Sequence, residues 1–192
     1  ALFRKLTRGL IDSKMGIAWT THMRFEKSLL EDQVWQDAKA SGCKYLHFGY
    51  ESGNERVLKL MDKATTTEIM TKHLKYTAEA GIWNHCMGFF GFPGETREEA
   101  WSSVEFLEQN KDYVHSLGFG TFDLGRHNPV AKHPEKFGVT AYKNPEWDLA
   151  LDYYFTVKQG LSIEEAERVF EEFERNHNPG WALRLFIRDY IF

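Results

Sequence analysis

Along the first 125 residues, segments with apolar residues at helical spacing alternate with runs typical of β-strands. Apolar residues spaced three or four apart predict helices over residues 1–12, 28–41, 54–61, 67–80 and 96–110. Runs rich in β-branched and aromatic residues predict strands over residues 15–25, 44–50, 82–90 and 116–124. Because strand and helix alternate, the pattern predicts a parallel sheet with right-handed crossovers.

The predicted helices carry recognisable start and stop signals. A Ser or Thr followed three residues later by Glu predicts a capping box at Ser28, Ser52, Thr65, Thr96 and Ser162. Gly42 and Gly81 follow the ends of two helices, where a left-handed backbone favours glycine. Each of these glycines introduces a strand, a glycine turn and a capped helix, so the chain repeats a βα unit. Ligands of such folds bind at the carboxyl ends of the strands.

The pattern changes after residue 125. Pro129, Pro134 and Gly138 among polar residues predict an irregular loop over residues 125–144. From residue 145 we expect helices: one over Trp147, Leu149, Leu151 and Phe155, one that begins at Ser162, and an apolar helix or packed tail over residues 181–192. The sequence therefore predicts two parts, residues 1–125 and residues 126–192.

Composition narrows the class of protein. The chain has 192 residues, of which 42% are hydrophobic and 15% aromatic, as in a folded globular domain. The net charge of −4 points to neither a nucleic-acid nor a membrane partner, and no segment reads as a membrane span or signal peptide. Two cysteines exclude a disulfide framework and favour the cytoplasm. The first residue is Ala1 instead of methionine, so we expect a fragment of a longer protein.

Two glycine-rich strand ends carry the candidate chemistry. They are YLHFGYESGNERVL (residues 45–58) and HCMGFFGFPGETREEA (residues 85–100). In each, a glycine turn leads directly into the first turn of a helix, and Gly53, Gly91 and Gly94 permit close backbone approach. Free N–H groups at a helix start suit an anionic or polar ligand. We therefore expect a ligand at this edge of the sheet.

These segments resemble a known family. GYESGNERVLKLMDKATT resembles the segment G-I-E-S-G-S-x-R-V-L-x-x-M-x-K-G-x-T of radical S-adenosylmethionine (radical SAM) enzymes. FFGFPGETREE resembles the family's fifth-strand segment G-x-I-x-G-x-x-E, with Pro93 as an additional residue. AWTTHMRFE looks like the preceding strand. The agreement in order and spacing covers residues 1–125 and is most like the branch that often carries a cobalamin-binding domain upstream.

The resemblance implies an α/β fold. This is a partial, TIM-like (β/α)6 barrel in which the chain supplies the third to sixth strands, followed by C-terminal helices. It implies S-adenosylmethionine and a 4Fe-4S cluster as cofactors of the full-length protein, with cobalamin as a further candidate. The implied S-adenosylmethionine contacts are the ribose neighbour Glu51 with Ser52 beside it, the methionine-carboxylate neighbour Lys63, the adenine-lining segment Gly91, Phe92, Gly94 and Glu95, and a weaker candidate, Arg24.

The chain departs from the family in its cysteines. The family holds three irons of its cluster with C-x3-C-x2-C, because thiolates are soft anionic ligands. Cys43 and Cys86 lack that spacing and are more simply small buried apolar groups. We expect the cluster loop and first strands to lie outside this chain. The complete enzyme would cleave S-adenosylmethionine reductively and abstract hydrogen from a small-molecule or unknown substrate, whereas this chain alone would be inactive.

Other interpretations stay open at this stage. Glu51 and Glu95 could simply be carboxylates that stabilise helix starts through the helix dipole. Lys63 could likewise stabilise a helix end. A metal-dependent barrel hydrolase would use His22, His47 and His85 on successive predicted strands, although core histidines explain them better, because none forms a tight H-x-H or H-x-x-x-H pair. The chain could also be a non-catalytic binding module derived from a barrel. An open barrel edge would favour self-association.

Overall fold

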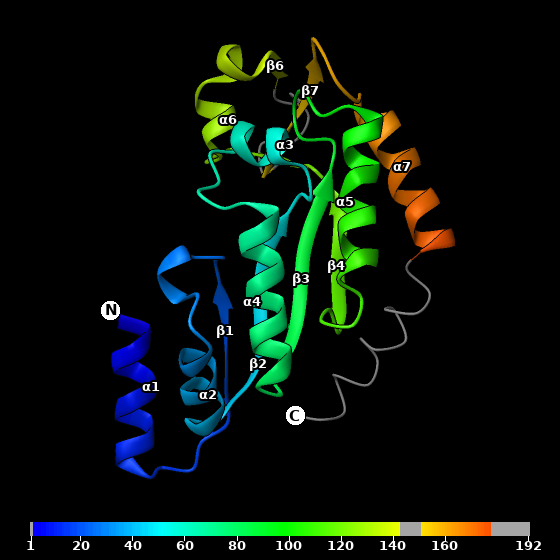
Figure 1. The fold of residues 1–192 in the computed structure, drawn as a ribbon. Helices are drawn as coiled ribbons and strands as arrows, with labels where there is room; N and C mark the ends of the chain where they lie inside the picture. The colour runs from blue at the N-terminus through cyan, green and yellow to red at the C-terminus, as the bar shows by residue number, and fades with distance from the viewer. Residues whose placement is uncertain (1, 143–150, 178–192) are drawn as a thin grey trace.

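The computed structural model describes residues 2–142 and 151–177 of the chain (Figure 1). The helices are α1 (Leu2–Ser13), α2 (Asp32–Ala40), α3 (Glu55–Leu60), α4 (Thr67–Glu79), α5 (Arg97–Gln109), α6 (Pro129–Lys132) and α7 (Ile163–Asn176), with the short 3-10 helices η1 (Lys27–Leu29) and η2 (Pro134–Phe137). The strands are β1 (Trp19–Met23), β2 (Cys43–Glu51), β3 (Trp83–Phe90), β4 (Ser116–Thr121), β5 (Leu124–Gly125), β6 (Val139–Tyr142) and β7 (Asp152–Val157).

The main sheet has the order β1-β2-β3-β4, and all of its strand pairs are parallel. The predicted alternation of strand and helix over residues 1–125 is therefore confirmed. Alternate residues of β2, among them Leu46, Phe48 and Tyr50, are fully buried in the main core, which also receives Trp35 of α2 and Leu107 of α5. Because β2 and β3 are parallel, a crossover connects them and their carboxyl ends lie at the same end of the sheet.

Several predicted helix boundaries are confirmed. Capping boxes form at Thr96 and Glu99 and at Ser162 and Glu165. Gly42 and Gly81 have φ angles of 98° and 74°, the left-handed backbone expected just past a helix end. Local hydrogen bonding at these positions therefore decides where the helices begin and end.

Three other predicted capping boxes are wrong. At α3, Asn54 is the cap, because its side chain accepts from the backbone N–H groups of two residues in the first turn. Ser52 instead faces Ser103 of α5. At α4 the cap is Thr66, one residue later than predicted. The remaining box, at Ser28, does not form because that residue lies in η1, and α2 begins only at Asp32.

The C-terminal part differs most from expectation. Where helices were predicted, β7 pairs antiparallel with β5 and β6 in a three-stranded sheet. Along β7, Phe155 is buried while Tyr154 and Thr156 are exposed, which is the two-residue period of a half-buried strand. The predicted irregular loop contains α6, η2 and β6. The helix beginning after Ser162 is confirmed as α7, and the predicted tail lies outside the described residues.

No helix in residues 2–142 and 151–177 is long and apolar enough to cross a membrane. Strand β1 forms one edge of the main sheet (Figure 1). The expected self-association through an open barrel edge stays a prediction.

Replacing Gly53 with alanine should destabilise the fold. A Cβ atom at this position would lie 2.7 Å from Cβ of Phe106 and 2.9 Å from Cα of Ser103, and it would also contact Tyr50. Because backbone and packed atoms of α5 must move, Gly53→Ala should lower the free energy of unfolding by about 2 kcal/mol. Urea unfolding followed by circular dichroism measures this change.

The matched control is Gly120→Ala in β4, where no heavy atom lies within 4 Å of the added Cβ. Its free energy of unfolding should change by less than about 1 kcal/mol. Equal stability of the Gly53→Ala protein and the parent would show that the turn and α5 are not closely packed.

Candidate functional site

A charged pair lies at the carboxyl end of β2. Glu51 ends the strand with φ +63°, a left-handed conformation that is uncommon for a residue other than glycine. Nζ of Lys63 donates to Oε1 of Glu51 at 2.8 Å. Their side chains are 21% exposed for Glu51 and 37% exposed for Lys63, so a ligand can reach both. The α3 helix turns the chain back and places a lysine twelve residues downstream beside the strand end.

Ser52 and Gly53 bind the strand end to α5. The buried Ser52 Oγ lies 3.1 Å from Oγ of Ser103, and the Gly53 N–H donates to the same Ser103 Oγ at 2.9 Å. The hydroxyl of Tyr50 donates to the Ser103 carbonyl at 2.7 Å. Ser52 therefore fixes the turn to α5 inside the core. Ser103 was missed by the sequence analysis, because a serine inside a predicted helix carries no functional signal of its own.

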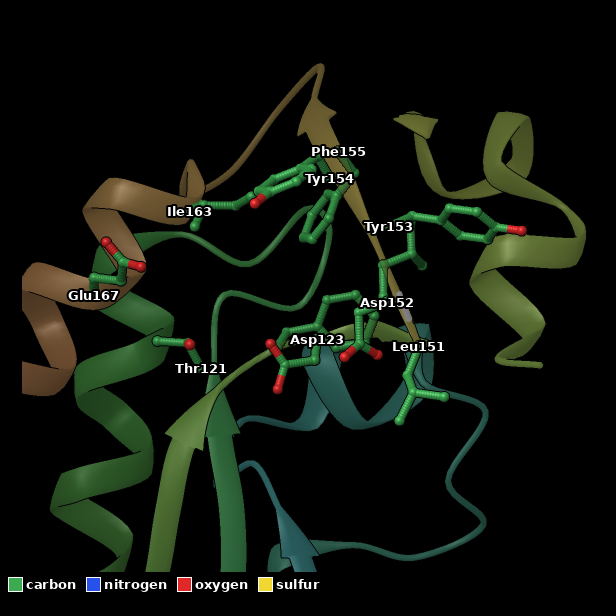
Figure 2. A pocket seen from close by; sticks show the side chains of 11 residues that line it. Thr121, Asp123, Leu151, Asp152, Tyr153, Tyr154, Phe155, Ile163 and Glu167 are labelled. Carbon is green, nitrogen blue, oxygen red and sulfur yellow. The ribbon is translucent and has the colours of Figure 1, made fainter. Parts of the chain in front are cut away.

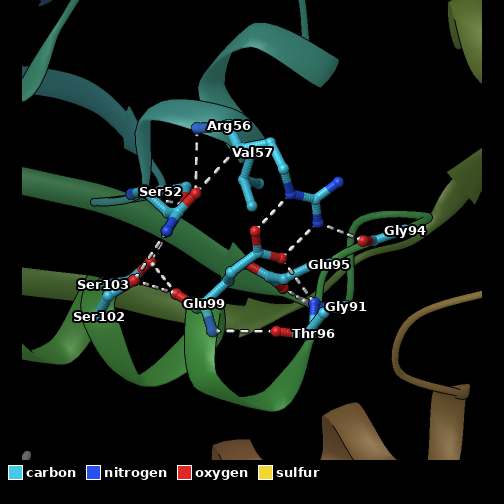
Figure 3. A network of polar contacts seen from close by, with 11 residues as sticks. Ser52, Arg56, Val57, Gly91, Gly94, Glu95, Thr96, Glu99, Ser102 and Ser103 are labelled. Carbon is cyan, nitrogen blue, oxygen red and sulfur yellow. Dashed lines mark hydrogen bonds and ion pairs between the residues drawn. The ribbon is translucent and has the colours of Figure 1, made fainter.

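The turn after β3 is built around a buried carboxyl group. Gly91 and Gly94 have φ angles of 84° and 90°, and the Gly91 N–H donates to Oε2 of Glu95 at 2.6 Å (Figure 3). Glu95 is fully buried, and its Oε1 has no hydrogen-bond partner among the described residues. Burial raises the pKa of Glu95 to about 7.

Arg56 joins α3 to this turn. Its guanidinium binds both carboxylate oxygens of Glu99, and it donates to the Gly94 carbonyl at 2.6 Å (Figure 3). This hydrogen bonding holds the pKa of Glu99 below its ordinary value. The two strand ends thus form one unit, tied by a bidentate ion pair. Arg56 was not predicted as a site residue, although it falls in the quoted motif.

The C-terminal part packs directly on the same turn. The Leu161 N–H donates to the Glu95 carbonyl at 2.8 Å. A Cβ atom at Gly160 would lie 2.6 Å from that carbonyl and 2.8 Å from Gly94, so only glycine permits the contact. The small antiparallel sheet and α7 therefore close one side of the candidate site.

The comparison with protein families decides how this edge is interpreted. The sequence profile of the Radical SAM superfamily matches residues 3–107, more than half of the chain. The chain belongs to the radical SAM superfamily. The matched residues include Glu51, Lys63 and the whole turn from Gly91 to Glu95, the positions that form the ion pair and the glycine turn.

Relatives of this radical SAM chain include named transferases. It is 31% identical over 174 residues to a probable threonylcarbamoyladenosine tRNA methylthiotransferase of Methanocaldococcus jannaschii, covering 88% of the chain and 36% of the relative. It is 27% identical over 177 residues to the cytidylyl-2-hydroxyethylphosphonate methyltransferase of Streptomyces wedmorensis, covering 86% of the chain and 32% of the relative. The chain therefore spans about a third of these relatives' length.

Solved structures agree on the fold. The radical SAM methyltransferase TsrM of Kitasatospora setae, solved with cobalamin and a 4Fe-4S cluster, superposes with a TM-score of 0.59 at 18% identity. The match covers 88% of this chain and 34% of TsrM. At this identity the likeness shows the fold, and the four-stranded parallel sheet corresponds to part of a radical SAM barrel.

The remaining predicted cofactor contacts lie in different surroundings. Phe92 is 5% exposed and packs against Phe122 and Phe137, so its side chain belongs to the second hydrophobic cluster. Arg24 is exposed after β1, and no hydrogen bond or ion pair joins its guanidinium to the described residues. The structure therefore groups Glu51 with Lys63 and Gly91 with Gly94 and Glu95, but it does not bring Arg24 to them by a contact.

The cysteines of this radical SAM chain do not fit a cluster. Cys43 and Cys86 are fully buried in the main core. Burial raises the pKa of the Cys43 thiol to about 12 and also raises the pKa of the Cys86 thiol. Protonated thiols are poor metal ligands. The prediction that these cysteines are small buried apolar groups is confirmed.

The three strand histidines share one row of the sheet. His22 pairs in register with His47, and His47 with His85. The first two rings stack at 4.5 Å, and the second pair meets edge to face at 5.4 Å. Within residues 2–142 and 151–177, no group of three His, Cys, Asp or Glu residues could hold a metal ion. The geometry therefore does not support the metal-hydrolase alternative.

A separate hollow of about 380 Å³ lies between the end of β4, β7 and α7 (Figure 2). Asp123, Asp152 and Glu167 line it together with aromatic side chains of β7. Burial, and then the neighbouring Asp152, raise the pKa of Asp123. The sequence analysis did not predict this hollow, because β7 was predicted as helix.

Replacing Glu95 with glutamine should flatten the pH dependence of stability. A carboxyl group whose pKa rises from 4.5 to about 7 on folding binds more protons in the folded chain. Its stabilising contribution is therefore complete below pH 4.5 and is lost as the pH rises through about 7. The loss is about 3 kcal/mol, since one pKa unit corresponds to about 1.4 kcal/mol.

Glutamine keeps an oxygen for the Gly91 N–H but does not titrate. The difference in unfolding free energy between parent and Glu95→Gln, measured in urea from pH 4.5 to 8, should change steadily in favour of the variant. Exposed Glu105→Gln on α5 is the control and should run parallel to the parent. Parallel curves for Glu95→Gln and the parent would contradict the assignment.

Proposed function

We propose that the protein carrying this chain is a radical SAM enzyme that transfers a methyl or methylthio group to its substrate. The observation that carries the proposal is the accessible Glu51–Lys63 pair, which lies beside the Gly91–Glu95 turn inside the family-matched region. The names of the relatives support group transfer over other radical reactions.

The charged pair suits two polar parts of S-adenosylmethionine, the ribose and the methionine carboxylate. Lys63 donates to Oε1 of Glu51. The other oxygen, Oε2, has no partner among the described side chains, so it can accept from ribose hydroxyls. The Lys63 ammonium has three N–H donors and uses one in its hydrogen bond to Glu51. The other two can therefore donate to the methionine carboxylate. Each side chain also holds its neighbour in place before the ligand arrives, which lowers the entropic cost of binding.

The glycine turn after β3 supplies the third part of this site. Its two left-handed glycines set the path of the backbone at the strand end, against which the adenine of S-adenosylmethionine would lie. Bound to a reduced 4Fe-4S cluster, S-adenosylmethionine supplies radical or methyl-transfer chemistry. The chain's own residues bind, orient and shield the cofactor. Cluster ligands and any cobalamin site of the whole protein would come from outside residues 1–192, because Cys43 and Cys86 are both buried in the core.

The proposal is tested on the full-length protein, reconstituted anaerobically with iron and sulfide. We expect about four irons per protein and S-adenosylmethionine turnover that requires a reductant. S-adenosylmethionine with a deuterated methyl group should transfer its label to a product. Protein that binds neither iron nor S-adenosylmethionine would instead be a non-catalytic module derived from the barrel.

Glu51→Gln and Lys63→Met should each weaken S-adenosylmethionine binding about tenfold, because each removes a charge-assisted hydrogen bond. The cluster content should not change. Isothermal titration calorimetry on the reconstituted full-length protein measures the affinity, with Glu105→Gln as the control for loss of an exposed carboxylate. Unchanged affinity in both variants would remove the pair from the site.

A further inference from the structure

A second cleft, of about 520 Å³, lies next to the candidate site and is strongly basic. It opens between α3, the turn after β3, η2 and the segment after β7. Figure 1 shows α3 beside the small C-terminal elements at the end of the sheet where β2 and β3 finish. Gly94 and Pro93 of the candidate turn form part of its wall. The cleft is therefore adjacent to the proposed cofactor site but distinct from Glu51 and Lys63.

Four cationic side chains line this cleft: Arg56, Lys59, Lys136 and Lys158. Glu99 neutralises the first of them. No carboxylate in the described part of the chain forms an ion pair with any of the three lysines. Glu135 is the one acidic side chain lining the cleft, and Nδ1 of the His133 ring lies 3.9 Å from its carboxylate. The four cations outnumber the two nearby carboxylates, Glu99 and Glu135, so a chain with a net charge of −4 has a net positive charge in this cleft.

The fold brings these lysines together from distant segments. Lys59 lies on α3, Lys136 on η2, and Lys158 directly after β7. Gly138, with φ +63°, reverses the chain after η2, and its carbonyl accepts the Lys158 N–H at 2.8 Å. Bringing like charges together without partners costs free energy, and an anionic ligand would recover that cost.

The cleft also has an apolar wall formed by Leu60, Pro93 and Phe137. A small cleft with several ammonium groups on one side and apolar surface on another matches an organic molecule that carries a phosphate group. Its volume suits a molecule of nucleotide size. A nucleic-acid backbone would call for a longer basic stripe, and the overall negative charge does not favour one.

We propose that this cleft binds a phosphate-bearing small molecule and, by its position, holds the substrate of the neighbouring site. The second half of this statement rests on the proposed radical SAM function. The first half does not, because binding can be measured on the 192-residue chain with neither S-adenosylmethionine nor a cluster present. Failure of one therefore leaves the other standing.

The test titrates inorganic pyrophosphate and uridine diphosphate into the chain at low salt, followed by calorimetry. Both should bind at millimolar concentration or better, and binding should weaken as salt rises. The double substitution Lys136→Gln with Lys158→Gln should weaken binding about tenfold, since both side chains are exposed and contribute charge directly. Tighter binding of uridine diphosphate than of pyrophosphate would support a role for the apolar wall.

The matched control is Lys5→Gln with Lys111→Gln, which removes the same charge at exposed sites away from the cleft. Its affinity should stay within about twofold of the parent. Glu51→Gln should also leave binding unchanged, which separates the cleft from the cofactor site. Equal losses in both lysine pairs, or no binding of either probe, would overturn the proposal. So would a short single-stranded RNA that binds more tightly than uridine diphosphate.

Discussion

The fold of the candidate site depends on the close approach of one turn to one helix. Gly53 has no side chain, so its backbone can lie against Ser103, whose hydroxyl accepts the Gly53 N–H. With Tyr50 bonded to the Ser103 carbonyl, the end of β2 cannot move independently of α5. Glu51 lies between these two anchors. Its carboxylate is therefore held by backbone geometry as well as by Lys63.

The turn after β3 is organised differently, around the buried carboxyl group of Glu95. One of its two oxygens, Oε1, has no hydrogen-bond partner among the described residues. Glu95 accepts one backbone N–H from Gly91, while its own carbonyl accepts Leu161. One residue thus connects the glycine turn to the C-terminal part of the chain. Arg56 and Glu99 join this turn to α3. Two loops far apart in the sequence are consequently joined, and the basic cleft adjoins them through Pro93 and Gly94.

Much of this could be predicted from the sequence because the signals are local. Strand runs, helical periods, Gly42, Gly81 and the Thr96 box each act within a few residues, and the motif around Glu51 indicated the family. Contacts between segments were not predictable in the same way. Asn54, and not the predicted Ser52, caps α3, because the Ser52 hydroxyl contacts Ser103, which lies 51 residues further along the chain. The strand β7 was predicted as helix because its apolar residues fit either period until its pairing with β5 and β6 is known. The lysines of the basic cleft come from three segments far apart in the sequence, so no single stretch of sequence contains them together.

The backbone of Glu51 has a consequence for attempts to improve this protein in the laboratory. Its left-handed conformation costs about 1 kcal/mol for any residue with a Cβ and nothing for glycine. Screens that reward only heat resistance should therefore favour glycine at this position and discard the carboxylate. Stability and the proposed binding of S-adenosylmethionine would therefore favour different residues at position 51. A mutant library intended to yield a more heat-resistant protein should keep Glu51 and vary the positions that surround it.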